Sequence, residues 1–336
     1  MNKILILILV LLISSISYAQ QNGSKINGTI QARGRVIIDN DFGGDPDGLF
    51  QLAHHLLSPS VEICGVISSH HYKEFYGYPG NVEYSFSQVK ELLNIMNMSG
   101  KIPVYKGAPS SLRDLKVPIE SEGSKAIIKE AMRKDTKTPL YIVCGAGLTN
   151  IASAFLMKPE ITDKIILIWI GGPEYEGLSM VPPQSHREYN LGIDIKATQV
   201  IYNVSNISIW QIPRDTYRQA LFSFSELTYR IKPVGKLGCF LMEKLEDLMK
   251  RADWNLGEAY VLGDSPLVLV TALQSSWEVA PSSSRYITRN TPKINDAGFY
   301  DGNQKGRPIR IFTNLDIRLM FEDMVAKLIL FEKNMR

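Results

Sequence analysis

The stretch that decides the fold is Val36-Ile37-Ile38-Asp39-Asn40-Asp41-Phe42-Gly43-Gly44-Asp45-Pro46-Asp47-Gly48-Leu49. Its β-branched start predicts a buried strand, and the glycines that follow let the backbone turn tightly. Four carboxylates come within nine residues, at Asp39, Asp41, Asp45 and Asp47. Acids crowded at one strand end repel one another unless a cation neutralises them, and their hard oxygen atoms favour Ca²⁺ or Mg²⁺. The stretch therefore predicts an acidic site in the loop after the first strand.

Two other interpretations of this loop are open at this level. A solvated turn in which Asp47 caps the following helix would need one acid rather than four. A phosphatase of the haloacid dehalogenase type also begins with a strand followed by two acids one residue apart. An EF-hand is excluded, because the downstream Glu and the alternating ligand spacing of its loop are absent.

Beyond the loop, short apolar runs alternate with amphipathic segments. We expect strands at residues 36–38, 61–68, 140–143, 165–170 and 207–212, and helices at residues 49–57, 86–98 and 150–157. This alternation predicts an α/β fold with a single open, mainly parallel sheet flanked by helices. Functional loops are then expected at the carboxyl ends of the strands. Residues 35–336 form one domain in this prediction, with a more helical cap region at residues 214–262.

Composition limits the class of function. The 336 residues contain 37 Lys and Arg against 34 Asp and Glu, a net charge of +3, and are 45% hydrophobic. The hydrophobic share excludes a disordered chain. Basic residues are too few and too scattered for binding that depends on a nucleic-acid backbone. We therefore expect a globular protein that does not bind nucleic acid.

The first residues have the pattern of a secretory signal peptide. Lys3 precedes an apolar run over residues 4–13, and Ser17-Tyr18-Ala19 offers a small-x-small cleavage site. We predict a signal peptide at residues 1–19, a flexible leader at residues 20–34, and an exported protein that is periplasmic or secreted. The apolar run is shorter than the roughly 20 residues that span a bilayer, so no membrane span is expected after cleavage. A retained N-terminal anchor is the alternative.

The cysteines fit this prediction without disulfides. Cys64, Cys144 and Cys239 are an odd number and lack a zinc-type spacing. A chain of this length can bury a sizeable core without such cross-links, so we expect buried free thiols.

Further motifs in chain order carry a resemblance to a known family. Besides the acidic loop they are Gly80-Asn81-Val82, Ile102-Pro103-Val104-Tyr105-Lys106-Gly107-Ala108, Cys144-Gly145-Ala146-Gly147-Leu148-Thr149-Asn150-Ile151-Ala152, Ile170-Gly171-Gly172 with Arg187-Glu188-Tyr189-Asn190, and Leu262-Gly263-Asp264-Ser265-Pro266-Leu267. Together they resemble the inosine/uridine-preferring nucleoside hydrolases, from about Arg35 to the C-terminus. The resemblance implies that family's fold and cleavage of ribonucleosides to base and ribose, and it outweighs the phosphatase interpretation.

The resemblance also implies a role for each matched residue. Asp41 would be the general base that takes a proton from a Ca²⁺-bound water, and it would ligate that ion. Asp264 and the carbonyl oxygen of Gly145 would be further metal ligands. Carboxylate and amide groups suited to ribose hydroxyls would come from Asn81, Glu188 and Asn190.

The acidic loop departs from the family pattern of two adjacent acids. Aligning the following helix places Asp47 on the ribose-binding acid and Gly48 on the metal-binding acid. Asp45 could then supply the missing metal ligand. The opposite assignment of Asp45 and Asp47 is also open.

A second departure concerns the leaving group. The family has a histidine where this chain has Gly263, so the usual acid for the departing base is missing. His70 or His71, in a loop longer than the family's, could act as that acid, and an ordinary surface loop is the alternative. Other polar and aromatic candidates are His54 and His55, expected to pack or lie at the surface, and Trp254 and Tyr260, expected to shape the base pocket or the core.

Three functions follow from these observations. The leading hypothesis is an exported, Ca²⁺-dependent nucleoside N-ribohydrolase of purine or pyrimidine salvage. A periplasmic ribonucleoside- or ribose-binding protein without catalysis is the second, motivated by Gly48 and Gly263. A hydrolase of another glycoside or of a phosphoester is the third. The expected partner is a small-molecule nucleoside, and the resemblance implies a homodimer or homotetramer.

Overall fold

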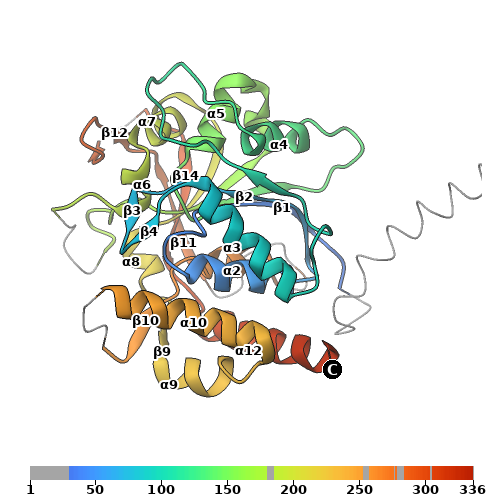
Figure 1. Ribbon diagram of the computed structural model, residues 1–336. Helices are drawn as coiled ribbons and strands as arrows, with labels where there is room; N and C mark the ends of the chain where they lie inside the picture. Colours follow the sequence, from blue (N-terminus) through green and yellow to red (C-terminus); the bar gives the residue numbers. More distant parts are fainter. Residues whose placement is uncertain are drawn as a thin grey trace, which may run out of the picture.

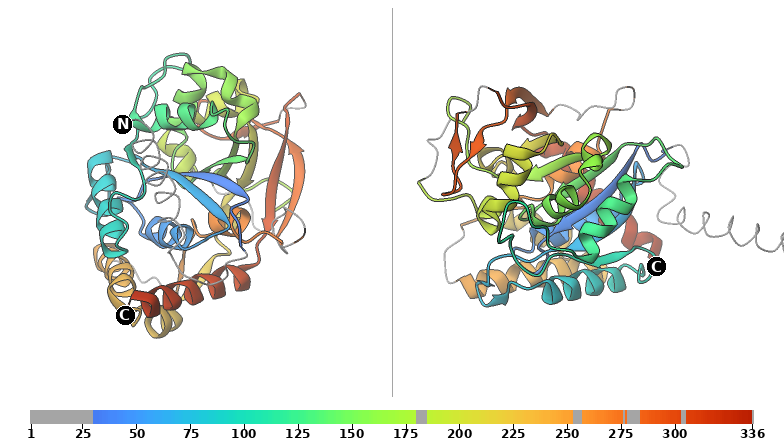
Figure 2. Two further views of the ribbon diagram at one scale, coloured as in Figure 1. Left: turned by 90° about the vertical axis from the view of Figure 1, so that its right-hand side faces the viewer. Right: turned by 90° about the horizontal axis from the view of Figure 1, so that it is seen from above.

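The apolar runs form an eight-stranded sheet in the computed structural model, which describes residues 30–179, 185–252, 257–275, 277, 284–302 and 305–335. The strand order is β11-β14-β8-β7-β6-β1-β2-β5. Every neighbouring pair is parallel except β11 with β14. The orange-red strands β11 and β14 lie at one side of the sheet (Figure 2). The predicted open, mainly parallel sheet is confirmed.

Five strands of this sheet lie at the predicted segments, with ends that differ by one or a few residues, whereas β5, β11 and β14 were not predicted. They are β1 (Gly34–Asn40), β2 (Val61–Ser68), β5 (Val104–Lys106), β6 (Leu140–Cys144), β7 (Ile166–Ile170), β8 (Ser208–Ile212), β11 (Arg285–Asn290) and β14 (Pro308–Asn314). Three two-stranded sheets accompany it: β3 (Glu74–Phe75) with β4 (Tyr78–Pro79), β9 (Leu221–Ser223) with β10 (Ala259–Val261), and β12 (Lys293–Ile294) with β13 (Tyr300–Asp301).

Helices cover both faces of the sheet, because successive side chains of a strand point to opposite sides. Val36 and Ile38 of β1 belong to one apolar core, and Ile37 belongs to the other. The first core is completed by α2 (Asp47–Leu56), α3 (Val82–Ile95), α10 (Gly235–Ala252), α11 (Pro266–Thr271) and α12 (Ile317–Met335). The second is completed by α4 (Glu122–Ala131), α5 (Thr149–Met157) and α7 (Ile195–Gln199). Figure 1 shows the two groups below and above the sheet.

Shorter helical elements connect these layers. They are α6 (Tyr189–Ile193), α8 (Arg214–Tyr217), α9 (Phe224–Glu226), a 3₁₀ turn (Pro159–Lys164) and two π-helical turns (Val200–Val204 and Leu227–Ile231). Two helices begin two or more residues earlier than the apolar pattern predicts, at Asp47 and Val82. Asn81 explains the second case, because its side chain accepts a hydrogen bond from the Tyr84 amide at 2.9 Å and so caps α3.

The segment 214–262 is mostly helical, as predicted. Its main helix, α10, buries Leu241 and Leu245 in the first core, where it packs against α3 and α12. The short β9–β10 ladder joins the two ends of the segment. Trp254 and residues 1–29 lie outside the described residues, so the signal peptide and most of the leader do too.

Two sequence expectations about polar side chains can be compared with the structure. His54 and His55 are fully buried packing residues: His54 Nε2 lies 2.7 Å from Asp323 Oδ2, and His55 bonds Thr271. The three cysteines are free, but only Cys144 is buried. The prediction is wrong for Cys239, which lies on the solvent side of the amphipathic α10, and Cys64 is only partly buried.

None of the helices in the described ranges has the length and apolar character needed to cross a membrane.

Candidate functional site

The acidic loop lies at the carboxyl edge of the sheet, where the parallel strands bring distant loops together. β1 is paired with β2 on one side and β6 on the other, so the loop after β1 meets those that follow Ser68 and Cys144. Asp264 joins them from just before α11, because its backbone amide donates to Asp47 Oδ2 at 3.1 Å. The site therefore assembles acids from both ends of the chain.

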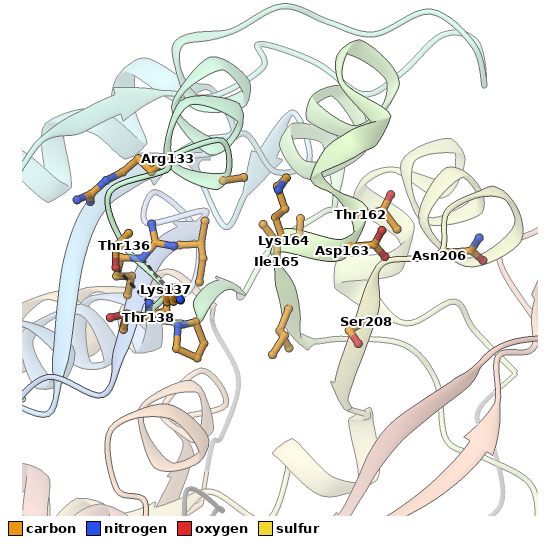
Figure 3. A pocket seen from close by; sticks show the side chains of 15 residues that line it. Arg133, Thr136, Lys137, Thr138, Thr162, Asp163, Lys164, Ile165, Asn206 and Ser208 are labelled. Atoms are coloured by element: carbon orange, nitrogen blue, oxygen red, sulfur yellow. Dashed lines mark hydrogen bonds between the residues drawn. The ribbon is translucent and has the colours of Figure 1, made fainter.

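A polar pocket of about 490 Å³ occupies the opposite edge, at the starts of β6, β7 and β8 (Figure 3). Two of its four basic lining residues are paired with acids, whereas Lys137 and Lys164 form no ion pair with a described residue. Arg35 and Arg133 both pair with Glu130, and Arg133 also pairs with Asp135. Asp163 is itself part of the lining. We assign the functional site to the carboxyl edge, where buried acids gather.

Asp41 is the acid of the loop that the protein leaves least constrained. It is 7% exposed, yet no hydrogen bond from another described residue reaches its carboxylate. Burial first, and then the charges of Asp264 and Asp45, raise the pKa of Asp41 well above its ordinary value. A buried carboxylate with a raised pKa and free lone pairs can accept a proton from a bound water.

Asp45 and Asp47 point to different partners. The Tyr260 hydroxyl donates to both oxygens of Asp45, at 2.8 Å each, and the Asp47 amide donates to Oδ1 at 3.1 Å. Asp47 instead faces Asp264 through the backbone bond described above. A β-carbon at Gly263 would lie 3.3 Å from Asp47 Oδ2, so the position of the missing family histidine borders Asp47.

Asn40 is a site residue that the sequence did not single out. It is fully buried, and its Nδ2 donates to Asp264 Oδ2 at 2.8 Å. Burial raises the pKa of Asp264 to about 7, and the bond from Asn40 opposes that rise. A β-carbon at Gly48 would lie 3.0 Å from Asn40 Nδ2, and one at Gly145 only 2.7 Å. The two glycines thus border the Asn40–Asp264 pair.

Glu188 and Asn190 lie beside the end of β7. Glu188 is buried and accepts from the Gly172 and Leu191 amides at 2.8 and 2.9 Å, and from the Tyr217 hydroxyl at 3.0 Å. Asn190 donates to the Ile170 carbonyl at 2.8 Å. The sequence did not indicate Tyr217 as a site residue, because only the tertiary fold brings the 214–262 segment to Glu188.

Asn81 lies at the same edge but is exposed. It caps α3, whose Ser85 backbone closely approaches Gly43 of the acidic loop. The structure therefore places Asn81 about one helical turn from the loop, with its side-chain oxygen engaged by the helix.

The two histidines after β2 face different surroundings. His70 Nδ1 lies 2.9 Å from the Ala108 carbonyl and its Nε2 3.4 Å from Ser111 Oγ. His71 is also buried, and burial lowers its pKa, which the nearby backbone of Gly43 opposes. Neither of its ring nitrogens makes a well-formed hydrogen bond to a described residue. A β-carbon at Gly44 would lie 3.6 Å from both His71 Cδ2 and Asp41 Oδ2, so His71 borders the acidic loop.

An aromatic cluster surrounds His71. The rings of His71 and Phe75 are 6.2 Å apart, Phe75 and Tyr189 5.7 Å, and Tyr72 and Tyr189 4.9 Å, all edge to face. The Tyr189 hydroxyl is buried and has no hydrogen-bond partner in the described part of the chain, and burial together with the charge of Asp41 raises its pKa. Phe75 and Tyr76 belong to the β3–β4 hairpin. Unpaired polar groups within an aromatic cluster suit a flat, polar ligand.

These features define an open α/β enzyme fold with carboxylate chemistry at the carboxyl edge of its sheet. The chain belongs to the inosine-uridine preferring nucleoside hydrolase family, whose sequence profile matches residues 36–320. Members of this family are N-ribosyl hydrolases.

Individual relatives agree with this assignment. An inosine-uridine preferring nucleoside hydrolase of Crithidia fasciculata is 32% identical over 119 residues, which are 34% of this chain and only 35% of that protein. A purine-preferring ribonucleoside hydrolase from Gardnerella vaginalis shares the fold with a TM-score of 0.67 and 18% identity, covering 89% of this chain and 99% of its own. A plant nucleoside hydrolase gives a TM-score of 0.68 at 17% identity, covering 88% and 99%.

The family is metal-dependent, so the residues of this chain should be compared with those that a bound cation would need. The sequence implied that Asp41, Asp45, the Gly145 carbonyl and Asp264 would hold Ca²⁺. The donors do not fit: Tyr260 occupies both oxygens of Asp45, and Asn40 directs an N–H group at Asp264. Across the described part of the chain, no group of three or more His, Cys, Asp or Glu side chains is arranged to hold a metal ion. The acids that the resemblance assigns to the metal therefore lie close together, but Asp45 and Asp264 already accept hydrogen bonds from the protein.

Proposed function

We propose that this protein hydrolyses the N-glycosidic bond of ribonucleosides, with Asp41 as the general base. Membership of a family of N-ribosyl hydrolases supports the reaction class. The observation that carries the choice of base is the free, buried carboxylate of Asp41 beside acids that already accept hydrogen bonds. Its raised pKa makes it a stronger base toward water than an exposed aspartate.

The neighbouring polar groups would hold the sugar. Asp47, Glu188 and Asn190 are buried or half-buried at the same edge, and their carboxylate and amide oxygens are suited to ribose hydroxyls. Asn81 would contribute from the start of α3. With the ribose held there, water deprotonated at Asp41 attacks the anomeric carbon as the bond to the base breaks.

The departing base would leave toward the aromatic cluster. We assign the proton donor to His71, which has both nitrogens unpaired and borders Asp41, rather than to His70, which bonds Ala108. The donated proton goes to the nitrogen of the base as its bond to ribose breaks, so that a neutral base is released. The Tyr189 hydroxyl offers a further hydrogen bond to the base.

A second candidate is a ribonucleoside- or ribose-binding protein without turnover. Gly48 and Gly263 favour it, because each replaces a side chain that the family uses in its reaction. Both candidates need the same pocket, so binding alone does not separate them.

Turnover separates the two candidates. The chain without residues 1–19 is incubated with purine and pyrimidine ribonucleosides, and released reducing sugar and free base are measured. Asp41→Asn serves as the matched control, with nucleoside binding followed by calorimetry. Hydrolysis that Asp41→Asn abolishes, with binding retained, supports the enzyme. Binding without any release of sugar from the unaltered chain supports the binding protein, and neither binding nor release contradicts both.

We also propose that the protein is exported and acts in salvage of external nucleosides as a homodimer or homotetramer. The N-terminal pattern of Lys3, an apolar run and a small-x-small site supports export. Cell fractionation with N-terminal sequencing would show a periplasmic or secreted chain beginning at Gln20, and light scattering would give the subunit number. A full-length chain in the cytoplasm would contradict the proposed export. A monomer in solution would contradict the proposed homodimer or homotetramer.

A further inference from the structure

We infer that the side-chain amide of Asn40 takes the place of the divalent cation in this chain, so that the acidic cluster is held together without a metal. The inference concerns binding and stability, and it does not depend on whether the protein turns over nucleosides.

The first observation is that two glycines converge on one pair of atoms. A β-carbon at Gly48 would lie 3.0 Å from Asn40 Nδ2 and 3.3 Å from Asp264 Oδ2. One at Gly145 would lie 2.7 Å from Asn40 Nδ2 and 2.5 Å from Asp264 Oδ1. Asn40 Nδ2 thus fills the space between three positions that the resemblance assigns to metal ligands. Larger side chains at Gly48 or Gly145 would collide with this arrangement.

The orientation of the Asn40 amide is fixed from both ends. Its Oδ1 accepts a hydrogen bond from the Asp41 amide at 2.8 Å, so its nitrogen must face Asp264 and Gln51. Turning the amide over would place its N–H groups against the Asp41 N–H group and its oxygen against the Asp264 carboxylate. An N–H donor cannot ligate a cation, so this orientation closes the position to Ca²⁺.

A buried relay stabilises that orientation further. Asn40 Nδ2 donates to Gln51 Oε1 at 3.3 Å, and Gln51 Nε2 donates to His55 Nδ1. His55 Nε2 then donates to Thr271 Oγ1 at 2.9 Å, and Thr271 donates to the Leu267 carbonyl at 2.6 Å. Each of these donor atoms meets an acceptor; β1 supplies Asn40, α2 supplies Gln51 and His55, and α11 supplies Thr271 and Leu267. The relay requires neutral His55, which agrees with its complete burial.

The remaining acids also obtain donors from the protein. Tyr260 bonds both oxygens of Asp45, and the Asp264 amide bonds Asp47. Hydrogen bonds from amides and a phenol therefore offset part of the repulsion that a cation would otherwise relieve. Among these acids, Asp41 is the one whose carboxylate receives no hydrogen bond from another described residue, so it can accept one from a ligand or water.

The test measures calcium binding and thermal unfolding of the chain without residues 1–19, in CaCl₂ and in EDTA. We expect no saturable heat of binding and the same midpoint of unfolding in both solutions. The double variant Asn40→Thr with Gly48→Asp removes the amide and restores a carboxylate. It should bind Ca²⁺, and its midpoint should rise by about 5 °C when calcium exceeds Kd a hundredfold.

A single variant guards against failure of the double variant to fold. Asn40→Asp keeps the shape of the side chain but replaces the donor by a further acid, so its folding should become calcium-dependent. Saturable calcium binding by the unaltered chain, or a lower midpoint in EDTA, would overturn the inference. Absence of calcium binding by every folded variant would show that Asn40 is not what excludes the cation. None of these readouts involves turnover, so an inactive protein gives the same answer.

Discussion

Tyr260 donates its hydroxyl to both carboxylate oxygens of Asp45, at 2.8 Å each, across 215 positions of sequence. The bond joins β10, from the helical 214–262 segment, to the loop after β1. It lowers the pKa of Asp45, which burial raises to about 6. The contact thus links the position of the cap segment to the electrostatics of the acidic loop.

Tyr260→Phe should destabilise the protein, because it removes this donor and leaves the carboxylate with the Asp47 amide alone. The expected cost is about 1–3 kcal/mol, measured by urea unfolding near neutral pH. Tyr229→Phe, at a residue that is 83% exposed, is the matched control and should leave the midpoint unchanged. Equal midpoints for the two variants would mean that the bond to Asp45 does not stabilise the fold.

Asp41→Asn should lower turnover and raise stability. Loss of a general base reduces rates by about 10²–10⁴-fold, measured as release of ribose. The midpoint of thermal unfolding should rise, because the change removes one buried charge that Asp264 and Asp45 repel. Asp163→Asn, at an exposed acid on the opposite edge, should change neither property. A drop in stability with Asp41→Asn would contradict the description of Asp41 as an unsatisfied acid.

His71→Leu should affect the leaving group without weakening the fold. His71 makes no well-formed hydrogen bond to a described residue, so stability should change little, whereas hydrolysis of natural nucleosides should fall by about 10²-fold. A riboside of 4-nitrophenol, which departs without a proton, should be cleaved at nearly the unaltered rate.

His70→Leu is the matched control for this prediction. It removes the bond to the Ala108 carbonyl and should cost about 1 kcal/mol of stability with little change in the ratio of the two substrates. If both variants slow the two substrates equally, His71 is not the proton donor.

Acid should destabilise the protein through His54. Burial lowers the pKa of His54 to about 4, against about 6.5 in the unfolded chain. The unfolded state therefore binds an extra proton between these values, and stability is lost as the pH falls from 6.5 toward 4. The full loss is about 3 kcal/mol at about 1.4 kcal/mol for each pKa unit.

Urea unfolding at pH 7.5 and pH 4.5 measures this loss. Asp323, the partner of His54, has a lowered pKa, so the stability that its charged form contributes is also lost as the pH falls. His54→Gln should flatten the dependence between pH 6.5 and 4.5, whereas His186→Gln, at an exposed residue, should leave it intact. An unchanged slope in His54→Gln would assign the acid sensitivity to other groups.

The sequence was informative wherever local pattern determines structure. The alternation of short β-branched runs with amphipathic segments predicted the parallel sheet, and acids after a buried strand predicted a site at its carboxyl edge. Gly48 and Gly263 could be recognised as departures from the family pattern because the loss of a side chain can be read directly from the sequence.

Contacts between distant segments could not be predicted in the same way. That Asn40 points at Asp264, and Tyr217 at Glu188, depends on packing between elements. His70 and His71 are adjacent in sequence but face different groups, so their difference emerged only from the fold. Cys239 lies among apolar neighbours, yet helical geometry turns it to solvent.

Tyr76 occupies a backbone conformation that its side chain disfavours. It has φ of 47° and Gly77 has φ of 81°, the sign pattern of a type I′ turn at the tip of the β3–β4 hairpin. Asn is the residue usually found at the first of these positions, and the other non-glycine residue with positive φ in the described ranges is indeed Asn97. The chain therefore keeps an aromatic ring where turn chemistry prefers an amide, which is typical of strain kept for function.

Tyr76→Asn should stabilise the protein by about 1 kcal/mol while raising KM for nucleosides, because the turn relaxes and the aromatic cluster beside Phe75 loses a ring. Urea unfolding and steady-state kinetics measure the two effects separately. Asn97→Tyr, the reverse change at the other left-handed position, should destabilise without changing KM. If Tyr76→Asn stabilises and leaves both KM and kcat unaltered, the ring has no part in binding the base, and the strain at Tyr76 has another origin.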